Sequence, residues 1–266
     1  IMAENILTVE NLNIAYQGVP AVMDVNFTLE RGKVLTIVGE SGSGKTTVIR
    51  ALMGLLPVGG EVTDGSMIFN GHDLRNLSKA EWRFLRGKDM AMIFQDSGSA
   101  LDPIVRIGKQ FRELFKSHIE IDNDECDRRA IELLEAVSLP NGADILRRYP
   151  HELSGGQRQR VGIAMALALD PKLLIGDEPT SALDVTTQSQ VVMQMLDLAK
   201  EHNSAIVMVT HNLGVAAYMS DYIIVMKKGR VVDAGTPKDI LENPSNEYTK
   251  QLKEAVPTLG GGRYID

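Results

Sequence analysis

Residues 39–47 read GESGSGKTT, between an apolar strand-like run, KVLTIVG, and a segment with helical character, TTVIRALMGLL. This stretch matches the pattern G-x-x-x-x-G-K-[ST] at every position. Glycines allow backbone N–H groups to wrap around a phosphate at a helix start, where unpaired donors and the helix dipole favour negative charge. The strand, loop and helix together predict a phosphate-binding site and disfavour a chance glycine-rich turn.

The polar residues of this loop have expected roles. We expect Lys45 to reach the β- and γ-phosphates of a nucleotide and the Thr46 hydroxyl to bind Mg²⁺. The predicted nucleotide-binding residues of the loop are Gly39, Glu40, Ser41, Gly42, Ser43, Gly44, Lys45, Thr46 and Thr47.

A second apolar run, LLIGDEP at 173–179, ends in the adjacent carboxylates of Asp177 and Glu178. Ligands of open α/β sheets bind at the carboxyl ends of the strands, so we expect both acids to face the phosphates. One acid is expected to belong to the Mg²⁺ shell and the other to orient or deprotonate an attacking water. Acids after a strand are usually part of a solvated loop, and the functional interpretation depends on Lys45 and Thr46.

Three other side chains are candidates for the same site. Gln95 closes the strand-like AMIFQ, and His211 follows AIVMVT. Each could be an ordinary polar strand end, but both are expected at the edge where the γ-phosphate would lie. Tyr16 in NIAYQG could pack in the core or form the flat platform that an adenine ring needs, and the residues leave both alternatives open.

The stretch LSGGQRQR at 153–160 is a second glycine-rich helix start, far along the chain from the first. Its serine, its two glycines and the dipole of the helix suit an anion equally well. A chain with one complete phosphate loop has no evident need of a second one for the same phosphate.

The order of segments predicts an α/β chain with an insertion. Strand-like runs fill the first third, periodic helical segments run from about residue 97 to 151, and strands then alternate with helices, which implies a largely parallel sheet. The run IIVMKKGRVVDAG is expected to form a hairpin. We expect one domain over 1–266, in which 1–96 and 157–240 form a catalytic core with a β subdomain, 97–156 a helical subdomain, and 241–266 a C-terminal tail.

Composition excludes several classes of protein. The 266 residues carry 28 basic and 35 acidic side chains, a net charge of -7 that argues against nucleic-acid binding. The single cysteine, Cys126, is expected to be a surface or half-buried helical thiol in a reducing compartment. Apolar runs such as VGIAMALAL are too short to span a bilayer, and the acidic start IMAENILTVE is not expected to be a signal peptide.

Seven motifs in order carry a family resemblance: AYQG, GESGSGKTT, Gln95, LSGGQ, LLIGDEP, SALD at 181–184, and the histidine after VMVT. From about Ile6 to Gly235 the chain resembles the ATP-binding cassette (ABC) ATPases, the nucleotide-binding subunits of membrane transporters. LSGGQ separates them from RecA-like and AAA motors. The resemblance implies a P-loop NTPase (RecA-like) α/β core with an N-terminal antiparallel β subdomain and an inserted α-helical subdomain.

The resemblance also implies a role for each matching position. Tyr16 would stack on adenine, Glu178 would be the general base, and His211 would sense the γ-phosphate of ATP. Gln95 would touch Mg²⁺ and the attacking water while linking to the helical subdomain, and Mg²⁺ would be held by Thr46, Gln95 and, through water, Asp177. The residues that would contact ATP bound to the other protomer of a head-to-tail dimer are Ser154, Gly155, Gly156 and Gln157. Asp184 would lie at the interface between the two protomers.

Longer segments of the sequence indicate which branch of the family the chain resembles. Residues 92–103, 148–190 and 242–257 resemble the ATPase subunits of bacterial dipeptide, oligopeptide and nickel importers. The implied partners are a second ABC ATPase subunit, identical or related, two transmembrane permeases, and a periplasmic or lipid-anchored substrate-binding protein, with no nucleic acid. The subunit would lie peripherally on the cytoplasmic face of the membrane. Several peptide-type relatives have a cysteine-rich C-terminal extension, and the lack of a cysteine after 126 favours a nickel-like or mixed-substrate branch.

Other ABC proteins are the alternatives. A soluble ABC ATPase of translation would carry two cassettes in one chain, and the DNA-maintenance type would contain long coiled coils; neither feature is visible. A regulatory cassette that does not hydrolyse ATP would lack the base, the signature or the histidine, which are all present. An exporter ATPase stays open as an alternative.

Overall fold

The computed structural model describes residues 5–96, 100–179 and 185–255, with the backbone alone described at 185–190. The chain forms two compact units, of which the first comprises Ile1–Trp82 and Ala205–Asp266 and the second Arg83–Ser204. The phosphate loop therefore belongs to the first unit and the LSGGQ stretch to the second. The domain boundaries expected from the sequence stay a prediction.

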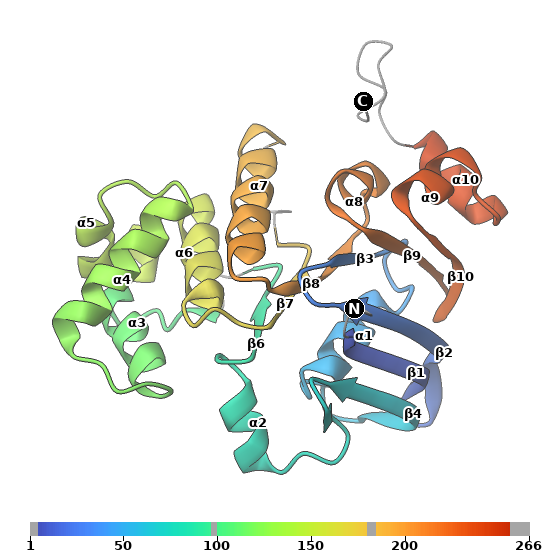
Figure 1. The fold of residues 1–266 in the computed structure, drawn as a ribbon, viewed down its shortest axis with the longest axis horizontal. Coiled ribbons are helices and arrows are strands. Elements are labelled where there is room, and N and C mark those ends of the chain that lie inside the picture. The colour runs from blue at the N-terminus through green and yellow to red at the C-terminus, as the bar shows by residue number, and fades with distance from the viewer. Residues whose placement is uncertain (1–4, 97–99, 180–184, 256–266) are drawn as a thin grey trace. The chain divides into compact units, whose positions relative to one another are not determined.

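An antiparallel sheet at the start of the first unit confirms the sheet expected there (Figure 1). From Val25 to Glu30 the side chains of its edge strand alternate between buried and exposed, as in an antiparallel sheet with one face on the core. The strands, in the spatial order β2-β1-β4-β5, are β1 (Asn5–Tyr16), β2 (Val19–Glu30), β4 (Gly60–Phe69) and β5 (His72–Asp73).

The first unit also contains strands that pair in parallel. Strand β3 (Val34–Val38) pairs in parallel with β8 (Ala205–Thr210) on one side and with β9 (Tyr222–Lys227) on the other. All residues of β8 are buried, which is typical of a parallel strand covered on both faces. Strand β10 (Arg230–Gly235) returns antiparallel to β9, so the predicted hairpin is confirmed.

The helices of the first unit follow from local signals. Asn212 begins α8 by accepting the backbone N–H groups of Gly214 and Val215, and Thr236 begins α9 in a capping box with Asp239. The helices are α1 (Lys45–Leu52), α8 (Leu213–Met219), α9 (Pro237–Glu242) and α10 (Glu247–Glu254), while α2 (Lys79–Leu85) runs from the first unit into the second.

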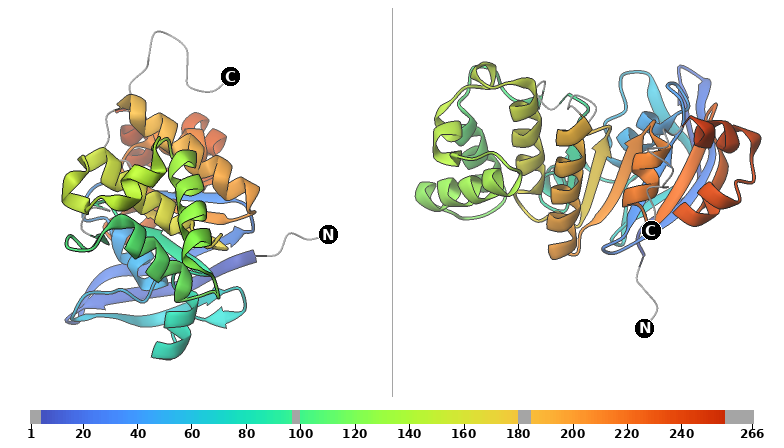
Figure 2. Two further views of the ribbon diagram at one scale, coloured as in Figure 1. Left: turned by 90° about the vertical axis from the view of Figure 1, so that its left-hand side faces the viewer. Right: turned by 90° about the horizontal axis from the view of Figure 1, so that it is seen from above.

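The second unit combines two parallel strands with a group of helices. Helices α3, α4 and α5 pack on one another, and α4 also packs on α6 (Figure 2). The strands are β6 (Met90–Ile93) and β7 (Leu173–Asp177), and the helices are α3 (Ile107–Lys116), α4 (Asn123–Ala136), α5 (Gly142–Arg147), α6 (Gly155–Leu167) and α7 (Val185–Glu201), with a short 3-10 turn at Pro150–Glu152.

The expectation for Cys126 was wrong in one respect. The residue lies on α4, as a helical thiol should, but its side chain is fully buried. Ala130 and Leu134 are buried with it, and residues four apart share one face of a helix. Cys126 is therefore part of the apolar stripe of α4, and burial raises the pKa of its thiol.

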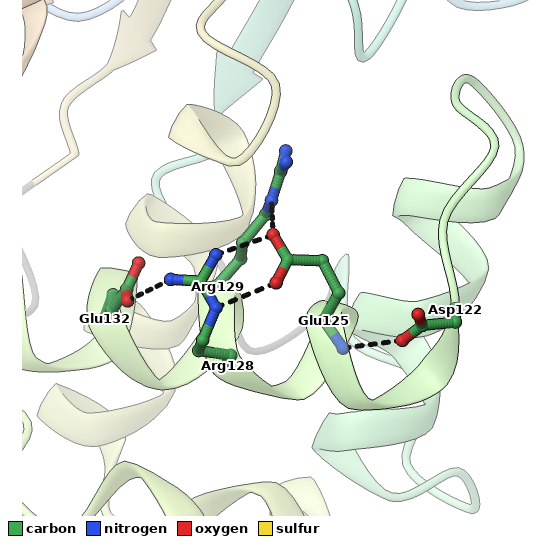
Figure 3. Close-up of polar contacts among 5 residues, drawn as sticks. All are labelled: Asp122, Glu125, Arg128, Arg129 and Glu132. Carbon is green, nitrogen blue, oxygen red and sulfur yellow. Dashed lines mark hydrogen bonds and ion pairs between the residues drawn. The ribbon is translucent and has the colours of Figure 1, made fainter.

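The opposite face of α4 carries a network of ion pairs (Figure 3). Glu125 accepts hydrogen bonds from Arg128 and Arg129, and Arg128 also donates to Glu132. Asp122 caps the helix by accepting the backbone N–H of Glu125 at 2.9 Å. The hydrogen bonds from Arg128 and then Arg129 lower the pKa of Glu125 to about 2.

Candidate nucleotide site

The phosphate loop joins β3 to α1 and has a backbone that only glycine permits at two positions. A Cβ atom on Gly39 would lie 2.2 Å from the carbonyl oxygen of Met226, closer than any side chain tolerates. Gly44 has φ +101 and immediately precedes α1. Because L-residues avoid this conformation, the glycines in the quoted pattern shape the turn that leads into the helix.

Lys45 lies folded beneath the loop. Its Nζ donates to the carbonyl oxygens of Gly39 and Glu40, both at 2.8 Å, and is 3.4 Å from Ser43 Oγ. The residue is only 6% exposed. The ammonium is thus held at the centre of the loop, where a compact positive charge suits a phosphate.

The loop is also attached to the β9–β10 hairpin. The backbone N–H of Gly229, at the turn of this hairpin, donates to the carbonyl of Ser43 at 3.0 Å. Gly229 in turn accepts the backbone N–H of Met23 on β2 at 2.8 Å. Backbone hydrogen bonds therefore connect the loop to two sheets of the same unit.

The structure brings Tyr16 to the start of α1. Its hydroxyl lies 3.5 Å from Thr47 Oγ1, and its ring is half-buried. A Cβ on Gly60 would lie 2.6 Å from the ring, so this glycine lets β4 approach the tyrosine closely. Tyr16 therefore lies beside the last residue of the predicted phosphate loop, while its role as an adenine platform stays a prediction.

His211 and the phosphate loop leave the same edge of the parallel strands. Val38 at the end of β3 is in register with Thr210 at the end of β8, and the next residues are Gly39 and His211. The histidine is exposed, and Asn212 then caps α8. This common edge is the one the sequence predicts for ligand binding.

The acidic residues and Gln95 are brought together in the second unit. Strands β6 and β7 are parallel, and Ile93 is in register with Gly176. Gln95 and Glu178 each follow these residues by two positions, beyond the same ends of the two strands. Asp177, the last residue of β7, is buried, whereas Gln95 is exposed.

Glu178 has a left-handed backbone, with φ +46. Such a conformation costs energy for a residue with a side chain, and it turns the chain sharply at the end of the strand. The side chain of Glu178 is half-buried. The strand end therefore separates the two adjacent acids into different environments.

A residue that the sequence reasoning missed connects these segments. Gln159 on α6 is 2% exposed, and its Nε2 donates to the carbonyl oxygens of Phe94 at 3.2 Å and Pro179 at 2.5 Å. Phe94 precedes Gln95 and Pro179 follows Glu178. The sequence could have indicated this residue by its spacing, because Gln159 lies on the same buried face of the helix as Ile163, Ala166 and Leu167.

The LSGGQ stretch begins α6 as expected from its composition. Ser154 is the N-cap, and its Oγ accepts the backbone N–H of Gln157 at 3.2 Å, while Gln157 Oε1 accepts the backbone N–H of Ser154 at 2.9 Å. Ser154 and Gly155 are exposed, and a Cβ on Gly155 would have its nearest neighbour at 3.9 Å. The helix start is open on this side. Asp184, the last predicted site residue, lies outside the described residues.

Comparison with known proteins identifies the family. The family model described as "ABC transporter" matches residues 22–181. The dipeptide transport ATP-binding protein DppD of Lactococcus lactis subsp. cremoris is 44% identical over 96% of this chain and 75% of its own length. The oligopeptide transport ATP-binding protein OppD of Haemophilus influenzae is 46% identical over 96% of this chain and 80% of its own length.

A solved structure gives the same assignment. The dimeric post-hydrolysis state of the ATP-binding cassette MJ0796, bound to ADP and Pi, matches with a TM-score of 0.77 at 28% identity, over 87% of this chain and 98% of that one. The predicted α/β fold class with its antiparallel and helical parts is thereby confirmed. In the part of the chain that is described, no helix is long and apolar enough to cross a membrane. This chain belongs to the ABC transporter family and is one of its ATP-binding, ATP-hydrolysing cassettes.

Proposed function

We propose that this cassette powers a bacterial importer for peptides, in which it hydrolyses ATP to ADP and phosphate. The observation that carries the proposal is the 44–46% identity to dipeptide and oligopeptide transport ATP-binding proteins over 96% of the chain. The likeness extends beyond the residues 22–181 that the family model covers and so includes the C-terminal third. Nickel, the other solute expected from the sequence, is the alternative that the experiment below separates.

Three side chains of the first unit are proposed to bind the nucleotide. The Lys45 ammonium has three N–H donors, so it would keep the carbonyl of Gly39 as one acceptor and direct its other N–H groups to the β- and γ-phosphates. Tyr16 would stack on adenine. His211, exposed at the shared strand edge, would hydrogen-bond the γ-phosphate.

The second unit is proposed to supply the base. Glu178 would accept a proton from the attacking water, and Gln95 would orient that water. Thr46, Gln95 and, through water, Asp177 would hold Mg²⁺, and their hydroxyl, amide and carboxylate oxygens are the hard donors that this ion prefers. Bound Mg²⁺ would neutralise charge on the phosphate oxygens.

The LSGGQ stretch is proposed to act on the ATP of a second cassette. The exposed start of α6 offers the N-terminal end of the helix dipole, and Gly155 leaves room for a phosphate to approach. To change a two-state equilibrium from 1:99 to 99:1 takes about 5.5 kcal/mol of differential binding. Two or three charge-assisted hydrogen bonds of about 1.5–3 kcal/mol each would suffice for each ATP.

Closure and release of two such cassettes would move the transmembrane partners. The proposed assembly contains a second ATPase subunit, identical or related, two permeases, and a periplasmic or lipid-anchored binding protein. The cassettes would lie on the cytoplasmic face of the membrane. The cargo would be selected by the permeases and the binding protein, which are the subunits that meet it.

Reconstitution tests the proposed solute. The chain would be co-expressed with permeases and a second ATPase subunit from its own genome, placed in proteoliposomes with the binding protein, and assayed for uptake of labelled dipeptide, oligopeptide and Ni²⁺. We expect ATP-dependent peptide uptake that is lost with Glu178→Gln. Uptake of Ni²⁺ alone, or ATP hydrolysis with no uptake, would refute a peptide importer.

A further inference from the structure

One peptide group of the phosphate loop has both of its polar atoms occupied by side chains. The carbonyl of Gly39 accepts the hydrogen bond from Lys45 Nζ at 2.8 Å. The N–H of the same peptide, which belongs to Glu40, donates to the hydroxyl oxygen of Tyr248 at 2.8 Å. Tyr248 lies on α10, and 208 residues separate it from Glu40. Both belong to the first unit.

The orientation of this peptide determines where Lys45 finds its acceptor. A peptide group is planar, so holding its N–H also fixes the direction of its C=O. Gly39 has no side chain to restrict rotation, and the position admits no other residue because of the carbonyl of Met226. The loop therefore needs an external contact to keep this plane in one orientation.

Tyr248 is itself held firmly. It is 7% exposed and belongs to a buried cluster with Val38, the residue before Gly39, and Leu213, the second residue after His211. The ammonium of Lys227 lies 4.4 Å from the centre of its ring. Burial raises the pKa of the Tyr248 hydroxyl, which keeps it protonated and neutral beside the loop.

We propose that Tyr248 is a positioning residue of the nucleotide site, whose hydroxyl fixes the Gly39–Glu40 peptide and thereby places Lys45 for ATP. The C-terminal helix α10 is then a functional part of the ATP site. The ring packs between the residues that precede the phosphate loop and follow His211, so α10 supports both segments at the shared strand edge. The proposal rests on ATP binding at this loop and does not depend on the transported solute.

Tyr248→Phe tests the hydroxyl, because phenylalanine keeps the ring in the buried cluster. Losing one neutral hydrogen bond should weaken ATP and ADP binding about fivefold in a calorimetric titration of the full chain. The kcat at saturating ATP should stay near that of wild type. Bound phosphate orders the loop, so the lost hydrogen bond weakens the binding of ATP and of the transition state equally. Tyr222→Phe, an exposed tyrosine on β9, is the matched control and should bind as wild type does.

Two further measurements separate positioning from packing. Amide exchange of Glu40 in the nucleotide-free protein should become faster in Tyr248→Phe, and Tyr248→Ala should weaken ATP binding at least as much as Tyr248→Phe. A Tyr248→Phe protein with lower melting temperature but unchanged nucleotide affinity and unchanged Glu40 exchange would overturn the proposal. So would weak binding in Tyr248→Ala alone, because the ring would then be responsible. Failure of wild type to bind ATP would instead refute the nucleotide site on which the proposal rests.

Discussion

At the scale of single residues, Glu178 gives the sharpest test of the proposed chemistry. Its backbone has φ +46, so a substitution must avoid branching at Cβ, which would add strain. Glu178→Gln meets this condition and removes the ability to accept a proton. We expect ATP affinity to be retained and turnover to fall by about 10²–10⁴-fold, the usual contribution of a general base.

ATP titration and a phosphate-release assay on the same preparation measure the two quantities. Glu201→Gln, which changes an exposed acid at the end of α7, is the matched control and should hydrolyse ATP as wild type does. Equal turnover by Glu178→Gln and wild type would remove Glu178 from the role of base.

A second residue, Gln159, gives a test of the stability of the fold. Its buried amide donates to two backbone carbonyls that flank Gln95 and Glu178 in the sequence, and Gln159→Leu replaces the amide with an apolar group of similar size. Removing a hydrogen-bond donor from a buried position costs about 1–3 kcal/mol. We therefore expect the free energy of unfolding to fall by this amount in urea titrations.

Gln251→Leu is the control for Gln159→Leu, because Gln251 is also helical but exposed. It should unfold at nearly the wild-type urea concentration. An unchanged midpoint in Gln159→Leu would show that the two hydrogen bonds do not hold the ends of β6 and β7.

At the scale of an element, the network on α4 predicts a dependence on pH (Figure 3). The pKa of Glu125 is lowered from its ordinary value of 4.5 to about 2. A carboxylate with a lowered pKa in the folded chain stabilises that chain at pH above 4.5, and the contribution is lost as the pH falls through about 2. Glu125→Gln should thus be less stable than wild type above pH 4.5, and the difference should vanish towards pH 2.

The network is largely solvent-accessible, so the effect should be small and should weaken with added salt. Unfolding in urea across the acid range, at low and high salt, measures it. Glu135→Gln, which changes an exposed acid of the same helix outside this network, is the matched control. A difference for Glu125→Gln that did not shrink with falling pH would contradict the assignment.

At the scale of the whole molecule, Ser154→Arg tests whether LSGGQ serves a second cassette. Ser154 is exposed at the open start of α6, so a bulky cation there should block a docking partner. We expect ATP binding to the monomer to be nearly unchanged and the cooperativity of ATP hydrolysis to be abolished. Equilibrium titration and the Hill coefficient of hydrolysis measure these effects.

Thr236→Arg provides the matched control, because Thr236 also caps a helix through a capping box. Both substitutions remove an N-cap, which costs about 0.5–2 kcal/mol of stability. Only Ser154→Arg should alter cooperativity. If it abolished nucleotide binding to the monomer, LSGGQ would belong to the pocket of its own chain.

Local patterns carry much of the fold and the candidate site. GESGSGKTT specifies its own loop, because the glycines permit the backbone and the following residues form a helix. The β9–β10 hairpin and the N-cap of α6 are equally local. Cys126 was misplaced because its spacing of four and eight residues from Ala130 and Leu134, which puts all three on one face of α4, was not used.

No local sequence pattern indicated the contacts between distant segments of the chain. Gln159 resembles any polar residue of an amphipathic helix until α6 packs against the ends of β6 and β7. Tyr248 resembles any aromatic residue in a C-terminal helix until α10 lies on the phosphate loop.

The sequence by itself determined the family, the phosphate loop and the identity of the candidate catalytic residues, because these depend on residue type at short spacing. Tertiary structure alone decided the register that pairs Val38 with Thr210, and with it the position of His211 along the predicted strand edge, and that Glu40 donates to Tyr248. The physical reason is that strand register and the burial of a hydroxyl arise from the packing of segments far apart in the chain, and neither is encoded at any single position.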